Sequence, residues 1–127
     1  QLKVKKDKME LALKAYATAA DYGIAEVSTA ATFQTAELYR DFGKALMTSQ
    51  RPKGLKRDEL EQYNVMLEEQ AFPFEEKAIE VHEVNAKRTA VGIYDSSVRE
   101  SITALGQLRP ARYNKVERAE RTVDAIR

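Results

Sequence analysis

The fold is decided by residues 60–81, which read LEQYNVMLEEQAFPFEEKAIEV. Apolar side chains recur through this stretch at intervals of three or four residues, a spacing that places them on one face of an α-helix. We therefore expect a long helix with one buried stripe, in a chain of the all-α class. The stripe consists of Leu60, Tyr63, Leu67, Ala71, Phe74, Ala78 and Val81.

Pro73 interrupts this stretch. A proline inside a helix removes a backbone hydrogen bond and clashes with the preceding turn, at a cost of about 3 kcal/mol. Either the helix kinks at Pro73 and continues to about Ala90, or it ends near Gln70 and a new helix begins with Pro73 in its first turn. The stripe keeps its phase across Pro73, which favours the kink, although Glu75 and Glu76 suit a helix start.

The same periodicity predicts helices on both sides, over about residues 4–20, 24–48, 96–109 and 111–126. In the second of these, small residues such as Ala36 and Gly43 allow a neighbouring backbone to approach closely. The expected buried stripes are Met9, Leu13, Tyr16 and Ala20; Ile24, Val27, Ala31, Leu38, Phe42 and Ala45; Val98, Ile102 and Leu105; and Val116, Ala119, Val123 and Ile126.

Short connections separate these segments. Residues 21–23, with Gly23, predict a tight turn, and residues 49–54 form the clearest loop. Residues 91–95 predict another turn, after which Asp95 or Ser96 caps the next helix. The connections are short enough for antiparallel helices in a single domain over residues 1–127.

Composition excludes several classes of protein. The 127 residues include no cysteine, so a disulfide framework or a cysteine metal site is excluded. The net charge is +1, from 21 basic and 20 acidic residues, which does not mark a general nucleic-acid binder. The acidic residues concentrate in residues 57–90, which carry nine acidic and four basic groups. These could pair with the basic ends of the chain or offer an acidic face to a partner.

No constellation of catalytic or metal-binding residues is visible. His82 is the single histidine and has Ala78 and Ala86 one turn away, so we expect a helix-surface or packing histidine. No Glu-x-x-His motif accompanies the glutamates of residues 68–83, as a carboxylate metal bundle would require. We expect no catalytic, metal or cofactor residues, and hence a protein that is not an enzyme and takes no small-molecule substrate.

Two segments share a spacing of small and large residues. They are Ala12-x3-Tyr16-x2-Ala19-Ala20 and Val98-x3-Ile102-x2-Leu105-Gly106-x3-Pro110. Both follow the second helix of a tetratricopeptide repeat, in which the small residue lies against the hairpin partner. Counting back from Pro110, a 34-residue unit would begin at Ile79, with its turn at Gly92.

The amino-acid sequence in the middle of the chain also resembles that of a known family. The segments that carry it are residues 36–43 (AELYRDFG), 49–55 (SQRPKGL), 58–63 (DELEQY), 67–79 (LEEQAFPFEEKAI) and 92–95 (GIYD). Over about residues 9–115 the chain resembles the C-terminal region of large tetratricopeptide-repeat proteins of the Gram-negative envelope. Such proteins accompany TonB/ExbB/ExbD-like energy-transducing systems or gliding-motility machinery. The resemblance implies a non-enzymatic scaffold in the periplasm or at the outer membrane, and no catalytic residues.

The sequence thus predicts a tetratricopeptide-like helical-repeat domain, a fragment of a longer chain, that binds other proteins. Aromatic side chains are enriched at the centres of interfaces. The candidate contacts are therefore Tyr39, Tyr63, Phe72 and Tyr94. The alternatives are a self-contained helical bundle that forms homo-oligomers and, more distantly, a basic helical module that binds nucleic acid. No stretch has the length of about 20 apolar residues that a membrane-spanning helix needs.

Overall fold

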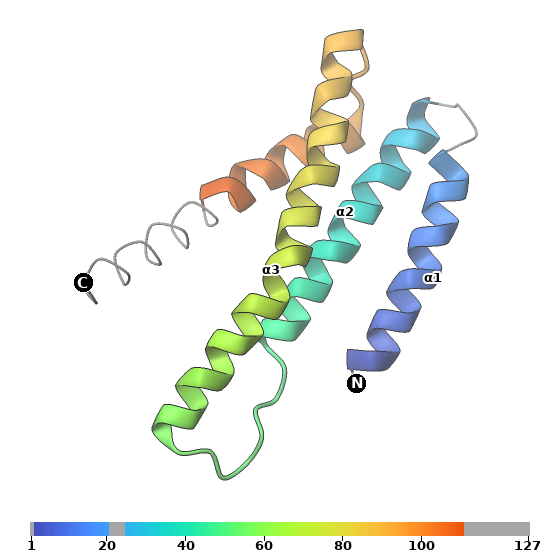
Figure 1. Ribbon diagram of the computed structural model, residues 1–127. Helices are drawn as coiled ribbons and strands as arrows, with labels where there is room; N and C mark the ends of the chain where they lie inside the picture. Colours follow the sequence, from blue (N-terminus) through green and yellow to red (C-terminus); the bar gives the residue numbers. More distant parts are fainter. Residues whose placement is uncertain (1, 21–24, 111–127) are drawn as a thin grey trace.

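The computed structural model describes residues 2–20 and 25–110 (Figure 1). Helix α1 spans Leu2–Ala20, α2 spans Ala25–Met47 and α3 spans Arg57–Lys87. A 3₁₀ turn, η1 (Arg88–Val91), follows α3, and residues 96–110 are again helical.

No strand occurs in the described ranges, which confirms the all-α prediction, and the helix bounds lie within a few residues of those expected. The turn expected at residues 21–23 and the helix expected beyond Pro110 lie outside these ranges. Within the same ranges, no helix combines the length and the apolarity needed to cross a bilayer.

Helix α2 lies between α1 and α3 and runs antiparallel to both (Figure 1). Residues 96–110 return against α2 and α3, away from α1. One face of α2 therefore packs against α1, and other faces of α2 pack against α3 and the last described helix.

Helix α3 continues through Pro73, so the alternative in which a helix ends near Gln70 is wrong. Pro73 is exposed, while Leu67 and Ala71 before it and Ala78 after it are all buried. Burial of one continuous stripe on both sides of the proline offsets the lost backbone bond. The helix ends at Lys87 rather than near Ala90, because the chain tightens into η1 before its turn.

The apolar core lies where α1, α2 and α3 meet. Its buried members are Met9 from α1, Phe42 and Leu46 from α2, and Ala71 from α3. The Phe42 ring meets the Phe74 ring edge-on, with 4.6 Å between centroids. Partly buried hydrophobic residues around this core are Leu2, Leu13, Leu38, Met47 and Phe74.

Small residues bring α2 and α3 together, as the sequence predicts. Ala36, Ala71 and Ala78 are fully buried. At Gly43, an added Cβ would lie 3.5 Å from Glu75 Cγ and 3.7 Å from the Ala71 carbonyl oxygen. The backbones of α2 and α3 therefore approach each other closely at Gly43, with little room between them for a larger side chain.

Three residues assigned to buried stripes are exposed instead. Val27 is 36% exposed, Leu60 is 37% and Ile102 is 42%. Leu60 belongs to the first turns of α3, which extend beyond the end of α2 (Figure 1). Beside Val27 and Ile102 the inward positions are taken by polar residues, Thr29 on α2 and Ser101 on the last helix. The predicted buried stripes are wrong at Val27 and Ile102 because they are based on apolar residues alone.

The connection after η1 has the form the sequence predicts. Gly92 adopts a left-handed conformation with φ of 84°, which glycine takes without strain. The backbone amide of Val98 donates to Asp95 Oδ1 at 3.0 Å, so Asp95 caps the helix that begins at residue 96. The 34-residue unit expected from Ile79 does not begin at a helix boundary, because Ile79 lies inside α3.

Candidate functional site

A buried polar cluster joins α2, α3 and residues 96–110. We define it as Thr29, Glu37, His82, Asn85 and Ser101. Thr29, His82, Asn85 and Ser101 have no exposed surface, while Glu37 is partly exposed. Buried polar groups are costly unless hydrogen-bonded, so the partners of each side chain decide what the cluster does.

His82 is held on both ring nitrogens. Its Nε2 lies 2.9 Å from Glu37 Oε2, and its Nδ1 lies 3.0 Å from Ser101 Oγ. Burial lowers the pKa of His82, and this outweighs the opposing effect of the Glu37 hydrogen bond. The ring is therefore neutral near pH 7, with Nε2–H donating to Glu37 and Nδ1 accepting from the Ser101 hydroxyl. The Phe33 ring packs 5.6 Å from the imidazole.

Asn85 uses both ends of its amide. Its Nδ2 donates to the Thr29 carbonyl at 3.0 Å and to Ser101 Oγ at 2.9 Å. Its Oδ1 accepts from Arg88 Nη1 at 2.6 Å, and the same nitrogen donates to Thr32 Oγ1 at 3.0 Å. One side chain thereby ties α3 to α2 and to the last described helix.

Asp95 extends the cluster to the turn after η1. The Thr29 hydroxyl donates to Asp95 Oδ2 at 2.5 Å. Burial acts to raise the pKa of Asp95, but the hydrogen bonds from Thr29 and from the amides of Val98 and Ser97 outweigh it and lower the pKa. The carboxylate is therefore charged at neutral pH, and it caps a helix while it holds α2.

The residue types Glu37, His82 and Ser101 also occur in hydrolytic triads. A nucleophilic serine must reach a substrate, whereas Ser101 and His82 are both completely buried. The Ser101 oxygen also accepts the amide of Asn85. This geometry fits a structural connection between helices better than nucleophilic catalysis.

The cluster fixes one wall of an apolar groove. This groove, which we call the α1–α3 groove, has a volume of about 350 Å³ and lies over α2, between α1 and α3. Thr32, which accepts the hydrogen bond from Arg88, belongs to its lining. The lining residues are Leu13, Tyr16 and Ala17 from α1; Ala31, Thr32, Thr35 and Tyr39 from α2; and Val81 and Val84 from α3.

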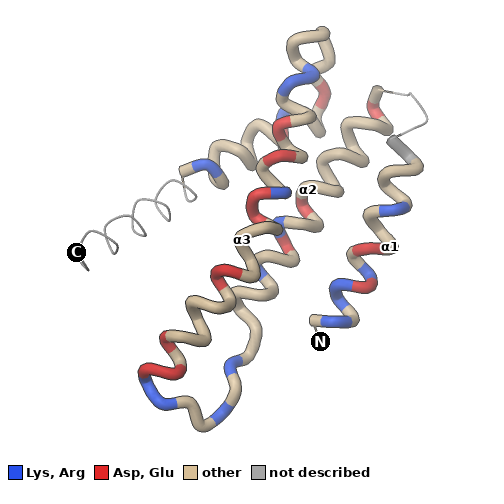
Figure 2. Tube along the Cα trace, viewed as in Figure 1, with Lys and Arg blue, Asp and Glu red and all other residues tan. Residues whose placement is uncertain are grey.

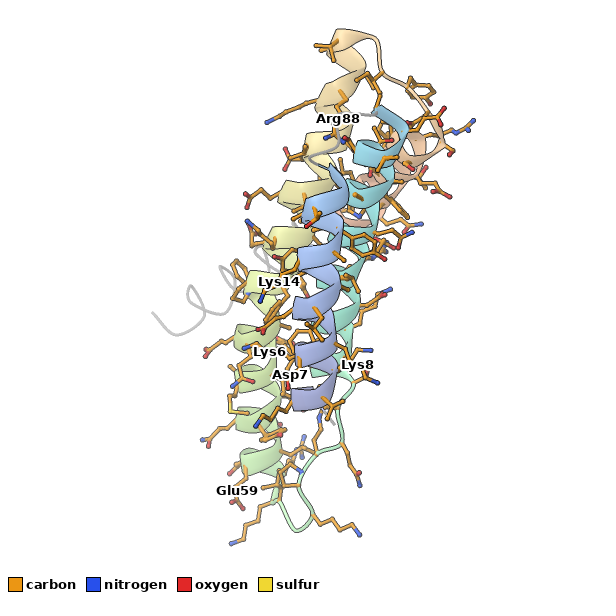
Figure 3. The ribbon with its side chains drawn as sticks, turned by 90° about the vertical axis from the view of Figure 1, so that its right-hand side faces the viewer. Lys6, Asp7, Lys8, Lys14, Glu59 and Arg88 are labelled. Carbon is orange, nitrogen blue, oxygen red and sulfur yellow. The ribbon has the colours of Figure 1, made fainter. Side chains whose placement is uncertain are left out.

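The groove presents apolar surface because its hydroxyl groups are already engaged. Thr32 donates to the Ser28 carbonyl at 2.8 Å, and Thr35 donates to the Ala31 carbonyl at 2.8 Å. Val84 is 46% exposed. Figure 3 views the molecule from the side of α1 and shows Lys14 near the middle of the helices and Arg88 toward one end. The arrangement suits apolar ligand groups better than polar ones.

Of the four predicted contact residues, one lines this groove. Tyr39 is half-buried in its floor. Tyr63 is half-buried on α3, outside the groove, while Phe72 is 44% exposed and Tyr94 is 62% exposed elsewhere. The structure therefore distributes these four aromatic residues over separate surfaces.

The spacing predicts that Leu13, Tyr16 and Val81 are core residues, and it does not mark Val84. It predicts an ordinary packing or surface histidine at position 82, without the partners that the structure gives His82. A signal was present: Ala78, His82 and Asn85 keep the spacing of the buried stripe of α3. If polar residues are included when the spacing is followed, the stripe predicts that His82 and Asn85 are buried.

The glutamates of residues 68–83 follow the expected pattern of a largely solvated face, with Glu68, Glu69, Glu76 and Glu80 exposed. In the described part of the chain, no three histidine or carboxylate side chains lie together as a metal site would need. In the nucleic-acid alternative, basic residues near the end of the chain would contact phosphate, and Arg109, one of these, pairs with Glu83 at 3.3 Å. Arg112, Lys115, Arg118 and Arg121 lie outside the described residues.

Comparison with known proteins finds no matching family model, no matching curated protein and no matching solved structure.

Proposed function

We propose that this chain is a non-enzymatic protein-interaction scaffold that receives an apolar segment of another protein in the α1–α3 groove. The observation that carries the proposal is the groove itself. Three helices from separate parts of the sequence converge on a concave, mainly apolar surface whose threonine hydroxyls are satisfied internally. A surface of this kind favours partner side chains that bury apolar area.

The geometry favours a helical or extended peptide segment as the ligand. Tyr16 and Tyr39 supply rigid aromatic surface, and Val81 and Val84 supply the opposite wall. Aromatic anchors of this kind commonly dominate binding energies at interfaces. The buried polar cluster holds α2 and α3 in register, so the floor of the groove and its α3 wall are formed before the partner binds, which lowers the cost of binding.

The setting we propose is a tetratricopeptide-like scaffold of a bacterial cell-envelope assembly, in the periplasm or at the outer membrane. Support for this setting comes from the resemblance in residues 36–43 and 67–79, together with long antiparallel helices that leave apolar side chains exposed. Fractionation of the native host with an antibody to this chain would test the location, and recovery in the cytoplasm would contradict it.

A display library of amphipathic helical peptides tests the groove directly. We expect enriched peptides to bind the wild-type chain and to lose about tenfold or more in affinity to Val84→Asp, since that change places a charge in the apolar wall. Val91→Asp is the matched control, because Val91 is 75% exposed and lies outside the groove. Equal losses of affinity in both variants would contradict the proposal. Enriched peptides that bind Val84→Asp as tightly as the wild type would also contradict it.

A further inference from the structure

The side of α1 that faces away from α2 carries apolar residues among lysines. Val4 is 50% exposed and Leu11 is 68% exposed. They are seven residues apart, so they share one side of the helix at a separation of about 10 Å. Figure 3 views this side and labels Asp7, Lys8 and Lys14 on it. We define the basic face as Lys3, Val4, Asp7, Lys8, Leu11 and Lys14.

The outer side of α3 carries apolar residues among carboxylates. A shallow groove of about 610 Å³ lies here, with Val65 54% exposed and Met66 37% exposed. Phe72 lies one heptad beyond Val65 and is 44% exposed. We define the acidic face as the lining of this groove, which is Asp58, Glu61, Gln62, Val65, Met66 and Glu69.

These two faces complement each other in charge and shape. Three lysines and one aspartate surround the apolar residues of the basic face, and three carboxylates surround those of the acidic face. Figure 2 shows the basic residues gathered on the first half of α1 and acidic residues along α3. Val4 and Leu11 are one heptad apart on the basic face, and Phe72 lies one heptad beyond Val65 of the acidic face, so the two apolar stripes match in length.

Their positions in the fold allow two copies to join by translation. Helices α1 and α3 run in the same direction on opposite sides of α2 (Figure 1). A second copy moved sideways therefore brings its α1 alongside the α3 of the first. The pair Arg57–Glu61, at 3.7 Å, is largely exposed on both sides, so Glu61 exchanges this partner for a lysine at little cost.

We propose that the chain self-associates head to tail, with the basic face of one copy packed against the acidic face of the next. Such a contact uses two different surfaces and does not close on itself, so it extends into open chains. A contact between two single helices is at the small end of interface sizes, so the association is weak. Because exposed charges contribute to it, it weakens as salt rises.

Light scattering of the full chain tests whether association occurs. We expect the mean mass to rise between about 10 μM and 1 mM protein at low salt, and to return toward the monomer at about 0.5 M salt. Tyr94→Asp is the control, because Tyr94 is exposed and belongs to neither face. A monomer mass throughout this range would overturn the proposal.

Mixing two variants tests the head-to-tail geometry. Leu11→Glu disables the basic face and Val65→Lys disables the acidic face, and both introduce good helix formers at exposed positions. We expect each variant alone to be monomeric and an equimolar mixture to form a dimer that grows no further. A mixture that stays monomeric, or a single variant that still associates, would overturn it.

This inference is independent of the proposed groove function. Val65→Lys leaves the α1–α3 groove unchanged, so peptide binding there is expected to be retained in a variant that no longer associates. Val65→Lys is expected to lose association and keep peptide binding. Val84→Asp is expected to lose peptide binding and keep association. These opposite results separate the two proposals.

Discussion

The two sides of α2 are held in different ways. Toward α3 and residues 96–110, small residues allow close contact and the buried polar cluster supplies directed hydrogen bonds. Toward α1, Met9 is the buried residue among the side chains of residues 2–18, with Leu2 and Leu13 partly buried. Apolar contact is roughly proportional to area and has no direction, whereas hydrogen bonds select one geometry. We infer that α2 and α3 form the rigid part and that α1 is the more easily displaced wall of the groove.

Substitution His82→Ala gives the largest expected effect on this comparison. It removes a fully buried ring, together with the hydrogen bonds that this ring makes to Glu37 Oε2 and to the Ser101 hydroxyl. We expect the free energy of unfolding to fall by about 3 kcal/mol, measured by urea denaturation. A loss below about 1 kcal/mol would mean that the cluster contributes little to holding α2 against α3.

Substitution Met9→Ala tests the other side of α2. We expect a loss of about 2 kcal/mol, at the low end for a buried methionine because Leu2 and Leu13, which pack beside Met9 from α1, are only partly buried. Hydrogen exchange should show faster exchange confined to the amides of α1, while α3 keeps its protection. Equal acceleration in α1 and α3 would contradict the division into a rigid part and a displaceable wall.

Acidification gives the smallest expected effect, because it changes one proton on His82 without removing the ring. Burial lowers the pKa of His82 below its usual 6.5. At a pH between these two values, His82 is therefore protonated in the unfolded chain and neutral in the folded chain. Stability is therefore expected to be constant above about pH 7.5 and to fall as the pH drops below 6.5 toward the folded-state pKa.

Thermal melts between about pH 5 and pH 8 measure this dependence, above the range where carboxylates titrate. The groups that face the imidazole from α2 are Glu37, which favours the protonated ring, and Arg40, which opposes it. His82→Gln is the control, and its stability should vary less over this range. A steeper fall in the variant than in the wild type would contradict the assignment to His82.

The helices, the turn at Gly92 and the cap at Asp95 were predictable because they depend on local spacing and backbone preference. The continuation through Pro73 followed from the phase of the stripe. The inward positions of Ser101 and His82 were not predictable from apolar periodicity, since polar residues break the pattern that defines the buried face. Their partners come from other helices: Glu37 lies 45 residues before His82, and Ser101 lies 19 residues after it.

The candidate site was predictable only through Tyr39. Residues such as Leu13 and Val81 lie at the edges of buried stripes, where one side of the side chain meets a neighbour and the other remains open. Spacing along one helix identifies such a residue as apolar and inward. Whether it closes a core or lines a groove depends on the distance between α1 and α3, which no single helix encodes.

The carboxylate of Asp95 has a consequence for the order of folding. It caps the helix that begins at residue 96 and also accepts the hydroxyl of Thr29, 66 residues earlier in the chain. The cap is a local interaction that forms quickly. The hydrogen bond to Thr29 closes a long loop, and its formation is slowed by the entropic cost of that closure. The α2–α3 hairpin is therefore expected to assemble first, and the last described helix to dock afterwards onto a surface that the hairpin has already organised.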